Sequence, residues 1–171
     1  MYQTGLKIGF LKSTNSSMAE NTYSSLKESG YVPEQELSVR KILATSELGK
    51  RYHLNVSGNK RSSLFQIDGV IISDGKRCDK LVLIEKAKDD WAEIFVELKG
   101  IDVASGIEQL KACLDNQIFR HVTNKELRAR IVAHSFPSHK LNPLMEKAKI
   151  EFRRKYHCDL RGMKNGQQDS I

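Results

Sequence analysis

The sequence lacks long apolar runs and has little cysteine. No stretch approaches the about 20 apolar residues that a membrane-spanning helix needs, so no membrane segment is predicted. Residues 1–12 are broken by lysine and glycine and carry no small-residue cleavage site, so no export signal is expected. The odd number of cysteines, without Cys-x-x-Cys spacing, argues against a disulfide framework or a cysteine zinc site: Cys78, Cys113 and Cys158. A cytoplasmic location is therefore expected.

Several catalytic motifs are missing as well. The five histidines show neither His-x-x-x-His nor His-Glu-x-x-His spacing, which argues against a zinc hydrolase: His53, His121, His134, His139 and His157. Ser135 lies in no Gly-x-Ser-x-Gly elbow, so acyl transfer is not expected. No Gly-x-x-x-x-Gly-Lys loop is present, so the chain is not expected to hydrolyse nucleotides by itself.

What is present is the composition of one globular domain with a basic surplus. The 171 residues are 39% hydrophobic and 29% charged, which is enough chain for one core and short for two. The 28 Lys and Arg exceed the 21 Asp and Glu, so the formal charge is +7. Such a surplus favours a polyanion because Lys and Arg that neutralise phosphates release counterions. Nucleic acid is the predicted partner, and a solvated basic surface is the alternative.

Periodicity and turn residues predict an α/β domain with a mixed sheet of about four strands. Two helices are expected before the first strand, three consecutive strands form an antiparallel meander, and an amphipathic helix packs on them. The predicted elements are helices over 18–28 and 33–49, a basic loop over 55–63, strands over 64–72, 78–84 and 91–98, a helix over 103–118, a strand over 127–136, a helix over 141–156 and a frayed polar tail from residue 162.

The centre of interest is a carboxylate and an ammonium that end an apolar strand. Side chains alternate along a strand, so Ile94, Val96 and Leu98 are expected on one face. Glu97 and Lys99 then point to the other face. If residues 86–90 form the hairpin loop, opposed positions sum to 176 and Asp79 faces Glu97, which would bring two carboxylates within reach of one hard cation.

These residues resemble the active centre of the PD-(D/E)xK nuclease superfamily. The resemblance rests on Asp79 at the start of one strand, Glu97-x-Lys99 at the end of the next, and Gln109-Leu110 on the following helix. The order α-β-β-β-α-β is also similar to the restriction-endonuclease-like core. That core would cover residues 33–136 of a single domain over 1–171, with a helical extension over 1–32, a C-terminal helix over 137–161 and a polar tail over 162–171.

The resemblance implies a Mg²⁺-dependent nuclease acting on DNA, with Mn²⁺ as a substitute. Asp79, Glu97 and the carbonyl of Leu98 would be metal ligands, Lys99 would act on the attacking water, and Gln109 would lie near the site. No proline precedes Asp79, and the acidic residue that many members supply from their first helix cannot be singled out from three candidates: Glu34, Glu36 and Glu47. A homodimer would ease cleavage of both strands. The alternative is an inactive module of the same fold that binds nucleic acid or protein.

Six basic residues are candidates for phosphate contacts. Two lie in the predicted loop, two flank Asp79 and two lie on the outer face of the last helix: Lys60, Arg61, Arg77, Lys80, Arg153 and Arg154. Exposed basic residues are more often simply solvated, so charge alone does not separate these two interpretations.

Overall fold

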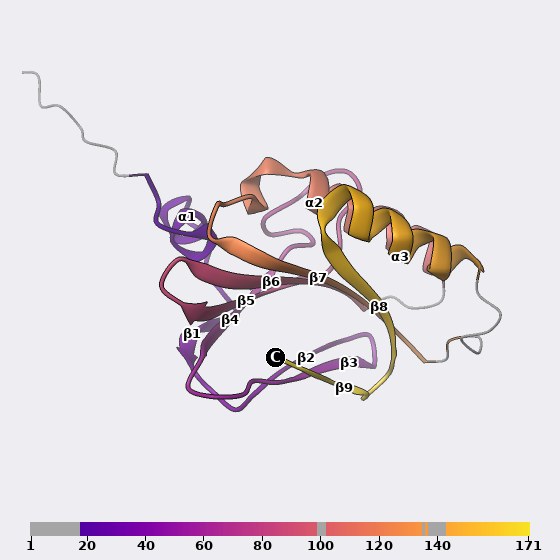
Figure 1. Cartoon of the computed structure of the whole chain (residues 1–171), viewed down its shortest axis with the longest axis horizontal. Coiled ribbons are helices and arrows are strands. Elements are labelled where there is room, and N and C mark those ends of the chain that lie inside the picture. Colours follow the sequence, from indigo (N-terminus) through magenta and orange to yellow (C-terminus); the bar gives the residue numbers. More distant parts are fainter. Residues whose placement is uncertain (1–17, 99–101, 135, 137–142) are drawn as a thin grey trace, which may run out of the picture.

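The computed structural model describes residues 18–98, 102–134, 136 and 143–171. Helices α2 and α3 lie on one side of a six-stranded sheet, and a three-stranded sheet lies on the other side (Figure 1). The elements are α1 (Thr22–Glu28), β1 (Gln35–Val39), β2 (Ile42–Glu47), β3 (Lys50–Asn55), β4 (Arg61–Gln66), β5 (Lys80–Ala87), β6 (Asp90–Glu97), α2 (Val103–Asp115), a 3₁₀ turn (Gln117–Phe119), β7 (Asn124–Ala133), α3 (Pro143–Tyr156), β8 (Cys158–Lys164) and β9 (Gln168–Ser170).

The large sheet is mixed, as predicted, but it has more strands than expected. Its order is β1-β4-β5-β6-β7-β8, and the small sheet has the order β2-β3-β9. Strands β4, β5 and β6 form the predicted antiparallel meander, whereas β6, β7 and β8 run parallel. The chain is therefore an α/β protein with a mixed sheet.

The two faces of β6 enter different cores, which confirms the predicted alternation. Ile94, Val96 and Leu98 are buried against the small sheet. Phe95 is buried on the helical side with residues of α2 and α3, and Glu97 faces Gly106 of α2. The strand that ends in Glu97 is thus anchored from both sides by apolar side chains.

The predicted register of the β5–β6 hairpin is confirmed. Lys80 pairs with Val96 and Glu85 pairs with Trp91, so opposed positions sum to 176. The predicted five-residue loop is wrong, because a register shift after Glu85 lets Ala87 pair with Asp90. The remaining tight turn places Asp89 at a φ of 59°, a left-handed conformation that Asp tolerates better than most residues.

The predicted helix over 33–49 is wrong, because this segment forms β1 and β2. Strand β1 pairs with β4, and β2 forms a hairpin with β3. In β3, Tyr52 and Leu54 are buried at alternate positions, and this period-2 pattern was a strand signal. From residue 18 onward, α1 is the one helix before the strands, and it begins at Thr22 because the side chain of Asn21 accepts the N–H of Ser24 at 2.9 Å.

The boundaries of the next two predicted strands also shift. The expected loop over 55–63 is shorter, since β4 already begins at Arg61, and the expected strand over 64–72 ends at Gln66. A turn follows, with Gly69 at a φ of 75°. The predicted strand over 127–136 is β7, which lies three residues earlier in the chain, at Asn124–Ala133.

The predicted frayed tail is wrong, because the polar C-terminus completes both sheets. Strand β8 pairs in parallel with β7, and β9 pairs in parallel with β3. Asp169 of β9 is buried, and its Oδ2 accepts from Arg130 Nε at 2.6 Å and from Tyr52 Oη at 2.9 Å. These hydrogen bonds hold β9 in the fold, although the polar composition of this segment would favour exposure to solvent.

Within the described ranges, no helix is both long enough and apolar enough to cross a membrane.

Candidate active site at the ends of β5 and β6

Two buried carboxylates meet where the start of β5 lies beside the end of β6. Glu97 is the last residue of β6 and is 1% exposed, whereas Asp79 immediately precedes β5 and is 0% exposed. The antiparallel pairing of β5 with β6 places these two strand ends together. Two buried carboxyl groups therefore belong to the same edge of the large sheet.

Asp79 is held tightly against the backbone of β6. Its N–H donates to the carbonyl of Val96 at 3.1 Å. Its carbonyl accepts the N–H of Ile67, the residue that follows β4, at 2.9 Å. Its Oδ2 accepts the N–H of Leu98 at 2.6 Å. The Asp79 carboxylate therefore lies beside the main chain that carries Glu97, within one residue of the position that the hairpin register predicts.

Gln109 of α2 contacts the other carboxylate. With its amide nitrogen oriented toward β6, Gln109 donates to Glu97 Oε2 at 2.9 Å and to Oε1 at 3.2 Å. Gly106 of α2 packs beside the same residue: a Cβ there would lie at ordinary contact distance, 3.5 Å from Glu97 Cγ and 3.6 Å from Ile131. Asp79, Glu97 and Gln109 are thus gathered from three elements into one site.

The nearby cysteine pair supports the start of β5. Cys78 and Cys113 are both fully buried, and the N–H of Cys78 donates to Cys113 Sγ at 3.2 Å. Burial raises the pKa of the Cys78 thiol, so this thiol is neutral at physiological pH. The contact ties the residue before Asp79 to α2, the same helix that carries Gln109.

The donor set suits a hard cation better than zinc. Among the described residues, no group of three or more His, Cys, Asp and Glu could hold a metal ion. Mg²⁺ is commonly held by one or two carboxylates and keeps several waters, so Asp79 and Glu97 with the Leu98 carbonyl fit its usual needs. Mn²⁺ prefers the same oxygen ligands.

Lys99, the predicted catalytic ammonium, lies outside the described residues. Lys80 is described, but it does not join Asp79. Successive strand residues point to opposite faces, and Lys80 Nζ bonds Glu34 Oε1 at 2.7 Å and also the Gln66 side chain. Lys80 and Glu34 therefore lie behind the site rather than within it.

The other two acidic candidates from the N-terminal region lie in different places. Glu36 bonds Lys27 at 2.8 Å and Tyr23 at 2.6 Å, beside α1. Glu47 ends β2 of the small sheet, which covers the face of the large sheet opposite to Glu97. Neither carboxylate is brought to the site by these described contacts.

The predicted phosphate-binding residues are dispersed. Arg77 is near Asp79 in the chain, and its Nε contacts Asp68 Oδ1 at 2.5 Å. Arg61 Nε contacts Glu85 Oε2 at 2.5 Å near the far end of β5, about 20 Å along the strand from Asp79. Lys60 Nζ donates to Ser57 Oγ at 3.2 Å. Arg153 and Arg154 are exposed on α3 and form no ion pair with a described residue.

A third buried carboxyl, Glu93, lies on the same face of β6 but outside this site. It is 2% exposed, and its Oε2 accepts from Asn124 Nδ2 at 3.1 Å. Burial raises the pKa of Glu93 well above its usual value, although the bond from Asn124 opposes the shift. The carboxyl is therefore expected to keep its proton at a pH where an exposed glutamate is charged.

Because buried Glu93 keeps its proton, the effect of Glu93→Gln on the free energy of unfolding is expected to depend on pH. Above the pKa of an unfolded glutamate, the native state binds more protons than the unfolded state, so wild-type stability falls as pH rises toward the raised pKa of Glu93. The substituted glutamine cannot ionise, so the variant should gain stability relative to wild type as pH rises, by at most about 1.4 kcal/mol per pH unit. Urea unfolding at pH 5, 6, 7 and 8 measures this difference. Parallel curves for the two proteins would contradict the buried proton.

Comparison with protein-family models, with curated proteins and with solved structures finds no match for the chain. The features of the chain that bear on function are the positions of Asp79, Glu97 and Gln109 and the motif around them.

Proposed function

We propose that the chain is a metal-dependent nuclease of the PD-(D/E)xK type that hydrolyses phosphodiester bonds, with DNA as its substrate. The observation that carries the proposal is the pair of buried carboxylates at adjoining ends of β5 and β6. Gln109 of α2 contacts one of them, Glu97. Buried ionisable groups gathered at one edge of a sheet are typical of catalytic and metal sites.

Each residue has a distinct proposed role. Asp79, Glu97 and the Leu98 carbonyl would hold Mg²⁺ or Mn²⁺, and Gln109 orients the Glu97 carboxylate by donating to it. The bound metal would supply a Lewis acid and an activated water. Lys99 follows the metal-binding strand and would align or deprotonate that water.

The location of the site also supports this proposal. Glu97 ends β6, which runs parallel to β7, and ligands of open α/β sheets bind outside the carboxyl ends of parallel strands. The formal charge of +7 favours a polyanionic substrate. A cytoplasmic homodimer, with two copies that each cut one strand, belongs to the same proposal.

A cleavage assay tests the proposal directly. The purified full chain is incubated with supercoiled plasmid, single-stranded DNA and RNA, each with Mg²⁺, Mn²⁺ or EDTA. The expected result is cleavage of DNA with either metal and none with EDTA. DNA binding without cleavage of any substrate would favour the inactive binding module instead.

Arg153 and Arg154 are expected to contribute phosphate contacts, because their charges are not used within the described chain. The slope of log affinity against log salt is negative, and each phosphate contact adds about 0.9 to its magnitude. Arg153→Ser with Arg154→Ser should therefore reduce that magnitude by about 2. Fluorescence anisotropy with a labelled duplex from 50 to about 300 mM salt measures this slope.

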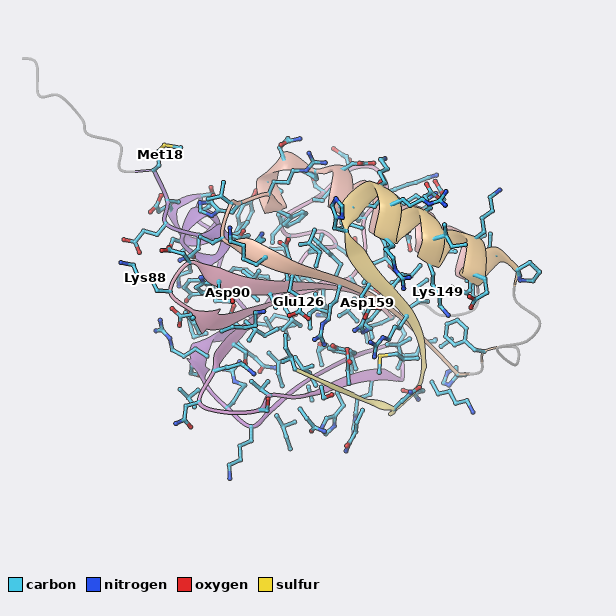
Figure 2. All side chains as sticks on the ribbon, viewed as in Figure 1. Met18, Lys88, Asp90, Glu126, Lys149 and Asp159 are labelled. Atoms are coloured by element: carbon cyan, nitrogen blue, oxygen red, sulfur yellow. The ribbon has the colours of Figure 1, made fainter. Side chains whose placement is uncertain are left out.

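The matched control removes the same charge from two exposed positions outside α3. Lys88 lies in the turn between β5 and β6, and Lys125 is exposed near the start of β7 (Figure 2 labels Lys88). Lys88→Ser with Lys125→Ser should leave the slope nearly unchanged. Equal slopes for wild type and the α3 variant would mean that α3 faces solvent or another chain.

A further inference from the structure

A second pocket lies on the helical side of the sheet, away from Asp79 and Glu97. It has a volume of about 630 Å³, within the usual range for small-molecule sites. Its most buried lining residues are Glu93, Phe95 and Phe119, and its most exposed are Met18 and Val122. The buried residues therefore form the floor, and the exposed residues mark the mouth, beside the start of the described chain (Figure 2 labels Met18).

The pocket is distinct from the proposed active site. Glu93 precedes Glu97 by four residues on β6, so their Cα atoms lie about 13 Å apart along the strand, with Phe95 between them. Asn124, which lines the pocket together with Glu93, is the first residue of β7. The pocket thus opens near the amino ends of β6 and β7, whereas Glu97 lies at the carboxyl end of β6.

Glu93 and Asn124, two residues that line the pocket, each carry an oxygen with unused hydrogen-bonding capacity. Glu93 is 98% buried, and its Oε1 forms no hydrogen bond with any residue that the structure describes. Asn124 Nδ2 contacts Glu93, the hydroxyl of Thr22 at 2.9 Å and the carbonyl of Phe119 at 3.0 Å. Asn124 Oδ1 has no partner in the same part of the chain. Unsatisfied buried polar atoms cost free energy, so a bound polar group would relieve both.

The walls and the rim limit the ligand to an uncharged molecule. Leu114, Leu127 and Tyr156 supply apolar and aromatic wall surface. At the rim, Lys155 and Arg120 both contact Asp115, at 3.2 Å and 3.9 Å, so their charges are partly compensated. A phosphate or carboxylate ligand would find no unpaired cation in these described contacts and would place its charge near Glu93.

The rim histidine is also occupied within the chain. His121 Nδ1 lies 2.8 Å from the hydroxyl of Thr123, and its Nε2 lies 3.0 Å from the carbonyl of Ala19. Its ring therefore helps to build the mouth and has no free nitrogen to offer a ligand.

We propose that this pocket binds a small, uncharged, amphipathic molecule whose apolar ring or chain fills the walls and whose polar head pairs with Glu93 and Asn124. The head must both donate and accept hydrogen bonds, as a carboxamide or a ring amide does, because Asn124 Oδ1 only accepts and a protonated Glu93 donates. The inference does not depend on nuclease activity, since none of its residues belongs to the proposed active site.

Three probes of one shape test this ligand class on the full chain: 2-naphthamide, 2-naphthoate and naphthalene. Affinities are measured by ligand-observed NMR titration. The amide is expected to bind saturably and at least about ten-fold more tightly than naphthalene or naphthoate, because only the amide satisfies both polar atoms without adding charge. Absence of saturable binding by the amide, or preference for naphthoate, would overturn the proposal.

Glu93→Leu supplies a second test, in which continued binding of naphthalene shows that the variant is still folded. The variant keeps an apolar side chain of similar size in the floor but removes the polar partner, so the preference for the amide over naphthalene should fall to about one while naphthalene still binds. The control is Glu126→Leu on β7, since the neighbouring Leu127 lines the pocket and Glu126 points to the opposite face. This control should keep the ten-fold preference, and an unchanged preference in Glu93→Leu would refute the role of Glu93.

Discussion

Glu97→Gln is expected to slow DNA cleavage by about 10²-fold or more while leaving the fold and DNA affinity nearly unchanged. Glutamine has the size of glutamate, and its carbonyl can still accept from Gln109, but it lacks the negative charge that would hold the cation. Loss of one group that stabilises transition-state charge commonly costs about 10² to 10³ in rate. Single-turnover cleavage with excess protein separates this loss from any change in affinity.

Glu108→Gln is the matched control, because Glu108 lies on α2 beside Gln109 but is 49% exposed and pairs with Lys111. It should cut at the wild-type rate. Mg²⁺ should also raise the melting temperature of wild type and of the control but not of Glu97→Gln, since binding to the native state alone stabilises it. Equal cleavage by all three proteins would remove Glu97 from the site.

Asp169→Ala is expected to destabilise the fold by about 3 to 5 kcal/mol. Arg130 is 0% exposed, and its Nε lies 2.6 Å from Asp169 Oδ2, so removing the carboxylate leaves a buried guanidinium with less compensation. The same change removes the partner of the buried Tyr52 hydroxyl. Since Arg130 lies on β7 and Asp169 on β9, the loss should separate the two sheets. Urea unfolding measures it.

The control for this prediction removes the other acid that contacts Arg130. Asp159 lies 3.1 Å from Arg130 Nη2, but it is 41% exposed and water can replace it. Asp159→Ala should therefore cost about 1 kcal/mol or less, as exposed ion pairs do. If both variants lose the same stability, the buried pair does not join the sheets in the way that the contacts indicate.

The hairpin at the centre of the fold was predictable because its signals are local. Ile94, Val96 and Leu98 alternate with Phe95 and Glu97, and one register satisfies this alternation on both β5 and β6. A shift of one residue would turn the residues of each face toward the opposite core, so the pattern fixes the pairing. The position of Asp79 beside β6 follows from that register.

The outer strands were not predictable in the same way. Strand β1 gains its hydrogen bonds from β4, and β9 gains its own from β3, more than 100 residues earlier in the chain. Asp169 gives no hydrophobic signal, and its burial depends on Arg130. Partners so distant in sequence can override local propensity, as they did at the predicted helix over 33–49.

The candidate site shows the same division. The placement of Asp79 beside the end of β6 follows from the strand register, whereas Gln109 was implied by the resemblance alone. In the structure, Asp79 accepts the N–H of Leu98, next to Glu97, and Gln109 contacts Glu97. Lys80 was expected beside Asp79 as a phosphate contact, yet strand alternation turns it to the other face, toward Glu34. Glu93 was missed because its burial requires α2, β7 and the 3₁₀ turn to close around it. The alternation of Glu93, Phe95 and Glu97 was the signal that could have found it.

The most direct test of the proposed function compares wild type with Lys99→Ala at saturating DNA in Mg²⁺. The substitution keeps both carboxylates, so DNA affinity by fluorescence anisotropy should remain within about two-fold of wild type. Cleavage should fall by about 10²-fold or more, the usual loss when an acid–base group is removed. Equal cleavage by the two proteins, or no cleavage by wild type with Mg²⁺ or Mn²⁺, would contradict the assignment of a nuclease active site to Asp79, Glu97 and Lys99.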